Sequence, residues 1–368
     1  MGKKGIILII SILFAFIVGF LILNPLKQKP VASVVISSYN MASTLPAAID
    51  SVLNQTVSNF ELIVIDDGST DNTKNVLKQY QKKDSRIHVI ENEKNLGLIK
   101  SLQKGLAQAQ GKYIIRMDAD DQSYPDRIER QMKFMDQYTL DLSGAQLDTE
   151  KRKYKPGDWV SPDAMDSTEL NFHLLFYNIL AHPTVIIRSS FLKRNSLSYN
   201  EEYPNAEDYN LWVQVMMKGG RIAIMGGAPV VTYHSTGHGA DWWKISDESV
   251  LKTRKVALRE IAPNITDKML KLPMCDLLQH IIEGNKETNF LNAEKLSEFE
   301  LQTCLPKLTF KHPNWEDSFT HMEQNRFKRK SVEDYAYVSR IKDKIEIKWD
   351  NWPVEYFKCT KGICKVME

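Results

Sequence analysis

The strongest constraint on the fold is a regular alternation of short apolar runs with amphipathic stretches in the first third of the chain. Four runs have the length and composition of buried strands: Val34–Ile36, Leu62–Ile65, Ile87–Ile90 and Tyr113–Met117. Apolar residues recur at helical spacing in the segments between them: Thr44–Leu53, Asp71–Gln81 and Leu98–Ala109. Strands that alternate with helices form a mainly parallel sheet with helices on both faces. The sequence therefore predicts an α/β fold.

The alternation continues less regularly after residue 140. Further strands are predicted at Asp141–Ala145, Thr184–Ile187, Ile222–Ile224 and Val230–Tyr233, and helices at Glu169–Leu180 and Asp208–Met217. Beyond Trp242 the pattern is helical to about Glu300 and then mixed, with a hairpin predicted from Ile345 to Val366. We expect one α/β domain over residues 30–239 and a mostly helical accessory region over residues 240–368.

The N-terminal end has the composition of a membrane span. No charged residue occurs between Gly5 and Leu26, and at about 1.5 Å per residue this stretch reaches roughly 30 Å, the thickness of a bilayer core. A cleaved signal peptide would have a shorter apolar core and a small-x-small site, and cleavage near Ala32 would cut into the first predicted strand. We expect residues 1–29 to form a retained transmembrane helix. Lysines flank both of its ends, so its orientation stays open.

The charge and cysteine content limit the partners, disulfides and metal sites that the chain is expected to have. The 48 basic and 46 acidic side chains nearly cancel, so nucleic acid is not an expected partner. All four cysteines lie after residue 274: Cys275, Cys304, Cys359 and Cys364. Two disulfides and four reduced thiols are both compatible with this clustering. A zinc site is disfavoured because no CxxC or neighbouring His pair accompanies them.

Polar clusters follow each of the first four predicted strands. In chain order these are Ser38-Tyr39-Asn40, Asp66-Asp67-Gly68-Ser69, Asn95-Leu96-Gly97 and Asp118-Ala119-Asp120-Asp121. In open α/β sheets, ligands bind beyond the carboxyl ends of the strands. The four clusters therefore predict a single binding site at that edge.

The carboxylates in these clusters suit phosphate and sugar chemistry. Asp118, Asp120 and Asp121 crowd one turn, which is costly unless a cation neutralises them, and such oxygen ligands suit Mg²⁺ or Mn²⁺. A cation there can stabilise a departing diphosphate. A solvated acidic turn that caps the helix predicted at Asp126–Met135 is the alternative. Asp67 can accept hydrogen bonds from a base or a sugar, or form an ordinary Asx turn.

Glu207 and Asp208 begin a predicted amphipathic helix. The positive end of a helix dipole favours the ionised carboxylate, which can act as a general base toward an alcohol. A plain helix cap is the alternative.

With these residues assembled, the chain resembles the family 2 glycosyltransferases over about residues 33–235. These are inverting enzymes of the Rossmann-like GT-A fold. The resemblance rests on seven motifs in order: Val34–Asn40, Phe60–Asp71, Asn95–Leu98, Asp118–Asp121, Pro125–Arg127, His182–Thr184 and Glu207–Tyr209. Any one of them is weak, whereas the ordered series is highly specific.

The resemblance implies a role for each matching residue. A nucleoside diphosphate sugar, expected to be a UDP-sugar, is bound by Ser38, Tyr39, Asn40, Asp67, Asn95 and Asp118. Asp120 and Asp121 hold Mn²⁺ or Mg²⁺, and Asp208 is the catalytic base. His182, Glu207 and His234 lie near the acceptor or the diphosphate. The implied reaction moves one hexosyl or N-acetylhexosaminyl unit to a hydroxyl of a glycan, lipid or protein.

Departures from the family pattern leave the donor open. Ser37-Ser38 replaces a common Pro-Thr, and Gln103 stands where Asn is common. No Gln-x-x-Arg-Trp is present, which favours single transfers over processive polymerisation. A non-catalytic sugar-nucleotide-binding protein would have no need for the complete carboxylate set, and a nucleotidyltransferase would need a Gly/Arg/Lys-rich loop after the first strand. The expected location is the Golgi or ER lumen in a eukaryote, or the inner membrane in a bacterium.

Overall fold

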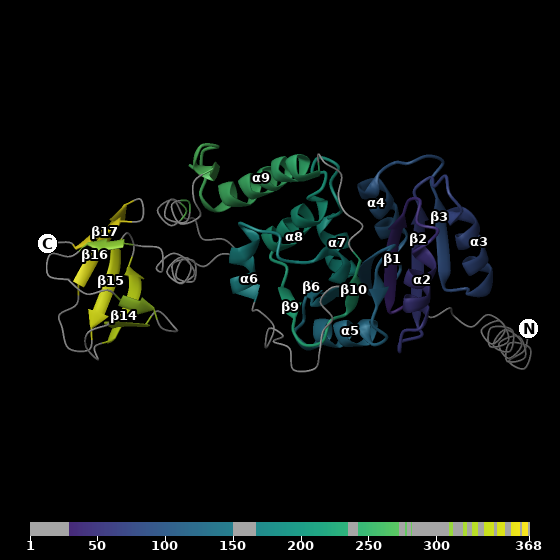
Figure 1. Cartoon of the computed structure of the whole chain (residues 1–368), viewed down its shortest axis with the longest axis horizontal. Helices are drawn as coiled ribbons and strands as arrows, with labels where there is room; N and C mark the ends of the chain where they lie inside the picture. The colour runs from purple at the N-terminus through teal and green to yellow at the C-terminus, as the bar shows by residue number, and fades with distance from the viewer. Residues whose placement is uncertain are drawn as a thin grey trace, which may run out of the picture.

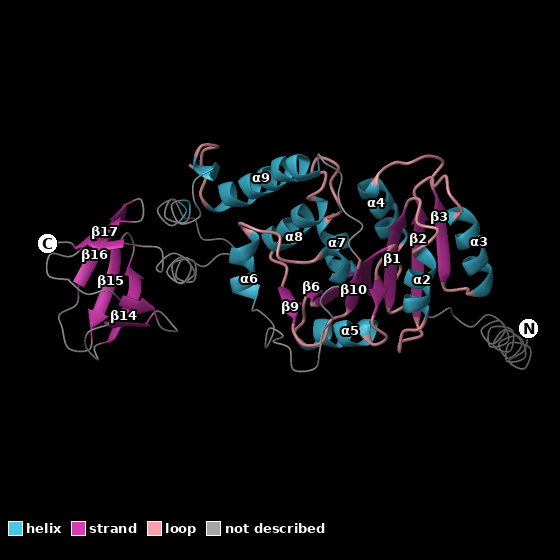
Figure 2. Cartoon of the chain, in the orientation of Figure 1, coloured by secondary structure: helices cyan, strands magenta, loops and turns pink. Residues whose placement is uncertain are grey.

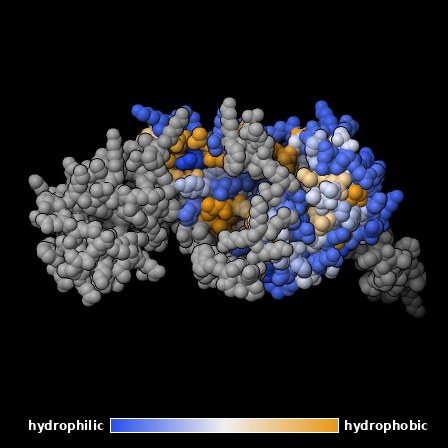
Figure 3. All heavy atoms as spheres, in the orientation of Figure 1, coloured by the Kyte–Doolittle hydropathy of each residue, from blue (hydrophilic) through white to orange (hydrophobic). Residues whose placement is uncertain are grey.

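The computed structural model describes residues 29–149, 167–234, 242–271, 277 and 281, together with strands between residues 309 and 366. Within these ranges no helix is long and apolar enough to cross a membrane. The predicted anchor lies outside the described residues except for Lys29. The described surface in Figure 3 is predominantly hydrophilic, with small apolar patches.

The core of the molecule is a seven-stranded sheet with the strand order β3-β2-β1-β4-β8-β6-β9 (Figure 1). Its strands are β1 (Ala32–Ser38), β2 (Phe60–Asp66), β3 (Ile87–Glu91), β4 (Tyr113–Asp118), β6 (Leu142–Ala145), β8 (Ile186–Arg188) and β9 (Ile222–Met225). All neighbouring pairs are parallel except those of β8, which runs antiparallel to both β4 and β6. The mainly parallel α/β sheet is confirmed.

Helices cover both faces of this sheet (Figure 2). They are α2 (Leu45–Leu53), α3 (Thr73–Lys83), α4 (Leu98–Gln108), α5 (Arg127–Gln137), α6 (Ser167–Leu174), α7 (Ser189–Asn195), α8 (Glu207–Met217) and α9 (Trp242–Ile261). Successive strand residues point to opposite faces, so Val34 packs in one core with Ile49 of α2, and Val35 packs in another with Leu102 of α4. Helices α2, α3 and α5 contribute to the first core, and α4, α6, α7, α8 and α9 to the second.

The parallel register places the predicted polar clusters along one edge of the sheet. Ser38 lies opposite Asp66, Asp66 lies opposite Glu91, and Ser37 lies opposite Asp118. The loops after β1, β2, β3 and β4 therefore leave the sheet side by side. We call this the carboxyl edge.

A second, three-stranded sheet extends the carboxyl edge. It pairs β10 (Val231–Tyr233) antiparallel to β5 (Gln122–Ser123) and parallel to β7 (Leu147–Thr149). Because β5 directly follows the acidic loop Asp118–Asp121, this pairing brings the end of β10 against that loop.

The second half of the chain differs from the predictions in two places. The strand predicted at Thr184–Ile187 is divided into a short 3-10 helix, η1 (His182–Thr184), and β8. The helix predicted at Glu169–Leu180 begins at Ser167 and ends at Leu174 as α6. In α9, Ala257, Leu258 and Ile261 join the same core as α8, so this helix packs on the α/β domain. The boundary after residue 239 stays a prediction.

The prediction of a mostly helical C-terminal region is wrong for the described residues after 308. A short η2 (Met269–Lys271) follows α9, and a seven-stranded sheet follows later in the chain. Its strands are β11 (Thr309–Lys311), β12 (Phe319–His321), β13 (Arg326–Arg329), β14 (Tyr335–Ile341), β15 (Lys344–Trp349), β16 (Glu355–Thr360) and β17 (Ile363–Val366). The period-two alternation in β15 is the strand signal that favours this outcome. Cys359 and Cys364 are backbone partners in the hairpin of β16 and β17.

Candidate active site

Asn40 connects the loops that follow β1 and β2. Its backbone has a φ of 55°, a conformation that Asn adopts more readily than most residues. Its Oδ1 accepts hydrogen bonds from the backbone amides of Thr70 at 2.8 Å and Asp71 at 3.3 Å, and its own amide donates to Ser69 Oγ at 2.9 Å. Asn40 therefore fixes two loops of the carboxyl edge relative to each other.

Asp67 performs the same task for the loop after β3. Its side chain is buried, with 3% exposure. Oδ1 accepts hydrogen bonds from Asn92 Nδ2 and from the amide of Leu96, both at 2.8 Å, and Oδ2 accepts from the amide of Gly97 at 2.9 Å. Because its carboxylate accepts three hydrogen bonds from this segment, Asp67 fixes the conformation of the loop at residues 92–97.

The other residues predicted to contact the donor differ in how they are placed. Ser38 is buried at the end of β1, where its hydroxyl donates to the carbonyl of Ile65 at 3.2 Å. Tyr39 is 41% exposed, which leaves its ring available to stack on a planar ligand. The Oδ1 of Asn95 accepts from the amide of Gly97 at 3.0 Å in an exposed turn. These residues share the carboxyl edge, and their predicted roles stay predictions.

The acidic loop contains carboxylates in two different environments. Asp118 is partly exposed and forms an ion pair with Arg116. Asp121 is fully buried, and its Oδ1 accepts a hydrogen bond from the backbone amide of His234 at 2.9 Å. Burial first, and then the nearby negative charge of Asp118, raise the pKa of Asp121 to about 7. The residue at the end of β10 thus reaches the acidic loop through its backbone.

The acidic loop has the donor chemistry for a divalent cation. Among the described residues, Oδ2 of Asp121 is buried without a hydrogen-bond partner, and burial together with the charges of Asp118 and Asp120 disfavours its ionised form. A cation held by Asp121 and Asp120 would supply that compensation. The described residues contain no ready-made group of three or more His, Cys, Asp or Glu side chains that could hold a metal. Water and ligand oxygens would have to complete the coordination shell.

Arg116 is the central cation of this site. It lies on β4 with only 5% exposure, and its Nε has no hydrogen-bond partner among the described residues. Residues two apart on a strand point to the same face, so Arg116 and Asp118 both face the helices of the second core. There the guanidinium interacts electrostatically with Glu207 at the start of α8 as well as with Asp118. It therefore connects the acidic loop with that helix.

Glu207 and Asp208 form a pair of adjacent carboxylates in the first turn of α8. Burial first, and then the charge of Asp208, raise the pKa of Glu207 to about 7. Asp208 is less enclosed, and its oxygens accept hydrogen bonds from Asn178 Nδ2 at 2.8 Å and from the amide of Tyr209 at 2.7 Å. Burial raises its pKa too, while these hydrogen bonds oppose the shift. Burial raises the pKa of both carboxylates, and Asp208 accepts the two hydrogen bonds that favour its ionised form.

His182 lies near this pair as a neutral, partly buried group. Its Nε2 shares a hydrogen bond of 2.8 Å with the hydroxyl of Tyr199, and its ring meets the edge of Trp212 at 5.8 Å. Burial first, and then the positive charge of Arg116, hold the pKa of His182 well below its usual 6.5. In this arrangement His182 supports the site from the core, and its predicted contact with acceptor or diphosphate stays a prediction.

Comparison with known proteins identifies the family. The family described as Glycosyl transferase family 2 matches residues 33–195. An uncharacterized glycosyltransferase of Haemophilus influenzae is 35% identical over 257 residues, which cover 67% of this chain and 77% of that protein. The chain belongs to glycosyltransferase family 2.

Two further comparisons are informative. A UDP-Glc:alpha-D-GlcNAc-diphosphoundecaprenol beta-1,3-glucosyltransferase of Escherichia coli is 34% identical over 188 residues, 51% of this chain and 70% of that enzyme. The structure of Staphylococcus aureus TarS 1–349 in complex with UDP-GlcNAc superposes with a TM-score of 0.52 at 17% identity, covering 82% of this chain and 97% of TarS 1–349. The second likeness supports the GT-A-like fold expected of a family 2 member.

Three residues of this family 2 site were not predicted from the sequence: Arg116, Asn178 and Tyr199. A signal existed for Arg116, since it is a charge in an otherwise apolar strand two residues before the acidic loop. Asn178 and Tyr199 had none, because their proximity to Asp208 and His182 depends on long-range packing.

Proposed function

We propose that this family 2 member is an inverting, metal-dependent glycosyltransferase that moves one sugar from a nucleoside diphosphate donor to a hydroxyl acceptor. The observation that supports it most is the pairing of two acidic groups around Arg116: the Asp118–Asp121 loop on one side and the Glu207–Asp208 pair on the other. Such a site offers a place for a charged diphosphate beside a base.

Asp208 is the base in this proposal. It takes the proton of the acceptor hydroxyl while that oxygen attacks the anomeric carbon, and the bond from that carbon to the diphosphate oxygen breaks on the opposite face. The configuration at the anomeric carbon inverts because attack and departure are in line. The amide of Asn178 orients Asp208 by donating to Oδ2. The raised pKa of Glu207 leaves that side chain partly protonated near neutral pH, which reduces the negative charge beside the base.

A divalent cation, Mn²⁺ or Mg²⁺, fits the acidic loop in this proposal. Asp120 and Asp121 would hold it, and when bound it would neutralise the charge of the departing diphosphate. Asp118 keeps its pairing with Arg116 and faces the nucleotide part of the donor.

We infer a UDP-sugar donor of the hexosyl or N-acetylhexosaminyl type. The E. coli relative uses UDP-glucose, and the structural relative was solved with UDP-GlcNAc. The exposed Tyr39 ring and the loops fixed by Asn40 and Asp67 provide a rigid surface for a planar base. A glycan, lipid or protein hydroxyl is the acceptor, and the E. coli relative supports a lipid-linked glycan among these.

We propose that residues 1–29 anchor the enzyme as a single-pass membrane protein. The relatives described above come from bacteria, which supports an inner-membrane location over a Golgi or ER lumen. The apolar, uncharged stretch between Gly5 and Leu26 supports the anchor itself.

The reaction class can be tested with a panel of nucleotide sugars. The full chain in detergent with Mn²⁺ is expected to release nucleoside diphosphate from one donor, and EDTA is expected to abolish the release. Release that continues unchanged in EDTA would contradict the metal dependence. Failure to bind any nucleotide sugar would favour the alternative of a partner-binding protein.

A further inference from the structure

The sheet edge opposite the carboxyl edge carries an excess of cationic side chains. Backbone hydrogen bonds join the segments that enter the strands there: Tyr113 to Val31, Ser189 to Lys112, and Asp141 to Arg221. Ten cationic side chains lie along this edge from β3 to β9: Lys29, Lys82, Lys83, Arg86, Lys112, Arg188, Lys193, Arg194, Lys218 and Arg221. We call this the basic edge.

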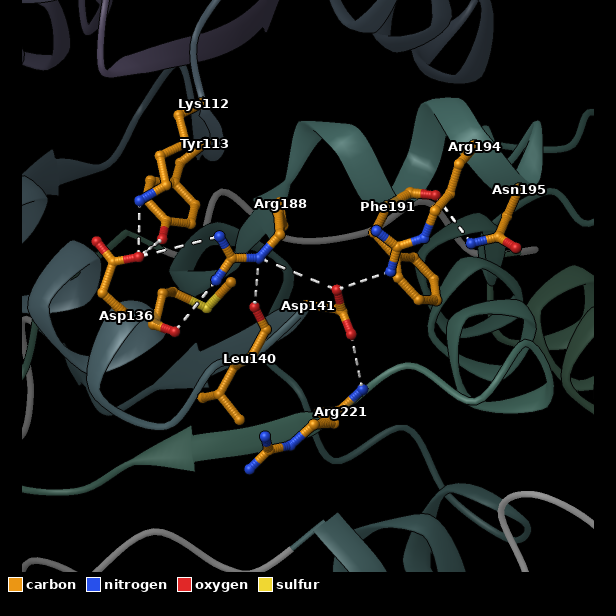
Figure 4. Close-up of polar contacts among 11 residues, drawn as sticks. Lys112, Tyr113, Asp136, Leu140, Asp141, Arg188, Phe191, Arg194, Asn195 and Arg221 are labelled. Atoms are coloured by element: carbon orange, nitrogen blue, oxygen red, sulfur yellow. Dashed lines mark hydrogen bonds and ion pairs between the residues drawn. The ribbon is translucent and has the colours of Figure 1, made fainter.

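The carboxylates among them are fewer and mostly neutralised. They are Asp50, Glu61, Asp84, Asp136 and Asp141, so ten cations face five anions. Asp136 accepts from Lys112 at 2.7 Å, and Asp141 pairs with Arg194 at 3.3 Å and accepts from the amide of Arg221 at 3.1 Å (Figure 4). Asp84 pairs with Arg86 at 2.7 Å, and Glu61 is buried. The exposed Lys82, Lys193 and Lys218 keep their charge toward solvent.

The two ends of the sheet therefore have opposite charge. The carboxyl edge gathers the acidic loop and the Glu207–Asp208 pair, whereas the basic edge has the surplus of cations. The chain enters the sheet at the basic edge, where the amide of Val31 donates to the carbonyl of Asn59 at 2.9 Å. Only two residues separate Leu26, the end of the uncharged apolar stretch, from Lys29, the first described residue. A bilayer that holds this stretch must lie near the basic edge.

We propose that the basic edge docks on the surface of an anionic lipid bilayer, with the carboxyl edge directed away from the membrane. Clustered Lys and Arg next to a membrane segment are attracted to anionic headgroups. This location rests on the anchor in the proposed function, while the attraction to anionic lipid rests on the edge itself. The seven residues of β1 at about 3.3 Å each place the site roughly 20 Å from the lipid surface.

This arrangement has two consequences. The acceptor hydroxyl must then lie about as far from the membrane as the site does. The short segment before β1, taken alone, would instead place the site at the membrane surface. The catalytic domain lies on the side of the membrane whose leaflet is rich in anionic lipid, which resolves the orientation that the flanking lysines leave open.

Lysine footprinting on the full chain tests the proposal. The protein is reconstituted in nanodiscs of phosphatidylcholine alone or mixed with phosphatidylglycerol, and acylation of each lysine is measured by mass spectrometry. Labelling of Lys82, Lys193 and Lys218 is expected to fall severalfold in the anionic discs and to recover at high salt. Lys94 and Lys100, exposed near the carboxyl edge, are matched controls whose labelling should not change. Equal labelling of the basic edge in both lipids would overturn the proposal.

Variants and a second assay separate this proposal from the proposed function. The double variant Lys193→Glu with Lys218→Glu should abolish the extra protection of Lys82 from acylation in anionic discs, whereas Lys94→Glu should not. Sugar transfer in detergent reports the activity independently of lipid charge. If the chain does not co-elute with either kind of nanodisc, residues 1–29 do not act as an anchor. Flotation with vesicles of the two lipid compositions then tests the basic edge by itself. Binding to anionic vesicles alone upholds the docking edge, and binding to neither overturns it.

Discussion

Arg116 Nη1 pairs with Oδ2 of Asp118 from a position two residues earlier on the same strand. The pair places a buried positive charge directly beneath the acidic loop and beside the first turn of α8. The charge of Arg116 offsets the mutual repulsion of the carboxylates of Asp118, Glu207 and Asp208. The site is therefore organised around a cation that belongs to the protein, in addition to any metal.

Replacing Arg116 with Met should damage both stability and transfer. Removing one partner of a buried ion pair costs about 3–5 kcal/mol, and we expect the lower end because Asp118 is 30% exposed. Urea unfolding measures the loss. The matched control is Lys100→Met, which removes an exposed pair with Glu201 and should cost less than about 1 kcal/mol. Equal effects of the two variants would show that Arg116 has no special role.

Glu207 should make stability fall as the pH rises. Its pKa of about 7 in the folded chain exceeds its ordinary value of 4.5, so between these values the folded protein binds a proton that the unfolded chain releases. Its favourable contribution to the free energy of unfolding is complete below about pH 4.5, declines between pH 4.5 and pH 7, and is absent above pH 7. The total loss is up to about 3 kcal/mol. Glu207→Gln should remove this decline.

Urea unfolding near pH 5 and near pH 8 in EDTA, which span most of the interval between the two pKa values, measures the Glu207 effect. Glu202→Gln is the control, because Glu202 is exposed and paired with Lys252. An unchanged pH dependence in Glu207→Gln would mean that Glu207 is ionised in the folded protein at neutral pH.

Asp121→Asn should raise the melting temperature of the metal-free protein and weaken the stabilisation that metal provides. A buried carboxylate whose pKa is raised destabilises the metal-free protein near pH 8, so the neutral amide should raise the melting temperature in EDTA. The same variant should lose the stabilisation that Mn²⁺ with a nucleoside diphosphate gives the parent protein. Thermal unfolding with and without Mn²⁺ measures both effects. The exposed Asp126→Asn should change neither, and a full Mn²⁺ response in Asp121→Asn would move the metal elsewhere.

Two glycines at the carboxyl edge provide a matched pair of substitutions. Gly68 has a φ of 71°, and an added Cβ would lie 2.4 Å from the carbonyl carbon of Lys94; Gly97 has a φ of 89° but open space around it. Gly97→Ala should cost about 1–3 kcal/mol through backbone strain alone, because a φ of 89° with a ψ of 159° is a conformation that few residues other than Gly adopt. Gly68→Ala should cost more and should also weaken donor binding, because it pushes apart the loops after β2 and β3. Similar unfolding energies and donor affinities for the two variants would contradict this loop contact.

The first four strands could be predicted because their apolar runs and the intervening helical patterns are local signals. The register of β1 to β4 then follows from the parallel fold, and it carries Ser38, Asp66 and Asp118 to one edge. The antiparallel direction of β8 was not predicted, since its pairing with β4 and β6 depends on long-range packing. Of the sheet between residues 309 and 366, only a hairpin from Ile345 to Val366 was predicted, and β16 and β17 form a hairpin within that range. The alternation of polar and apolar residues in β15 was the local signal for more strands.

The candidate site could be predicted in its acidic residues but not in its supports. Asp67, Asp121 and Asp208 belong to short motifs at strand or helix ends, where ligands bind. Their partners are distant in sequence: the amide of Gly97 for Asp67, the amide of His234 for Asp121 and the side chain of Asn178 for Asp208. Only the folded chain reveals that Asp67 supports a loop and that Asp121 lies buried.

The most direct test of the central claim compares Asp208→Asn with the parent protein in two assays on the same preparation. Loss of the base should lower the rate of sugar transfer by about 10²–10⁴-fold, while the affinity for the donor in the presence of Mn²⁺ should stay nearly unchanged. Asp267→Asn, which alters an exposed carboxylate paired with Lys255, should match the parent in both assays. Donor binding that collapses together with transfer, or transfer that persists at the parent rate, would contradict the assignment of Asp208 as the base.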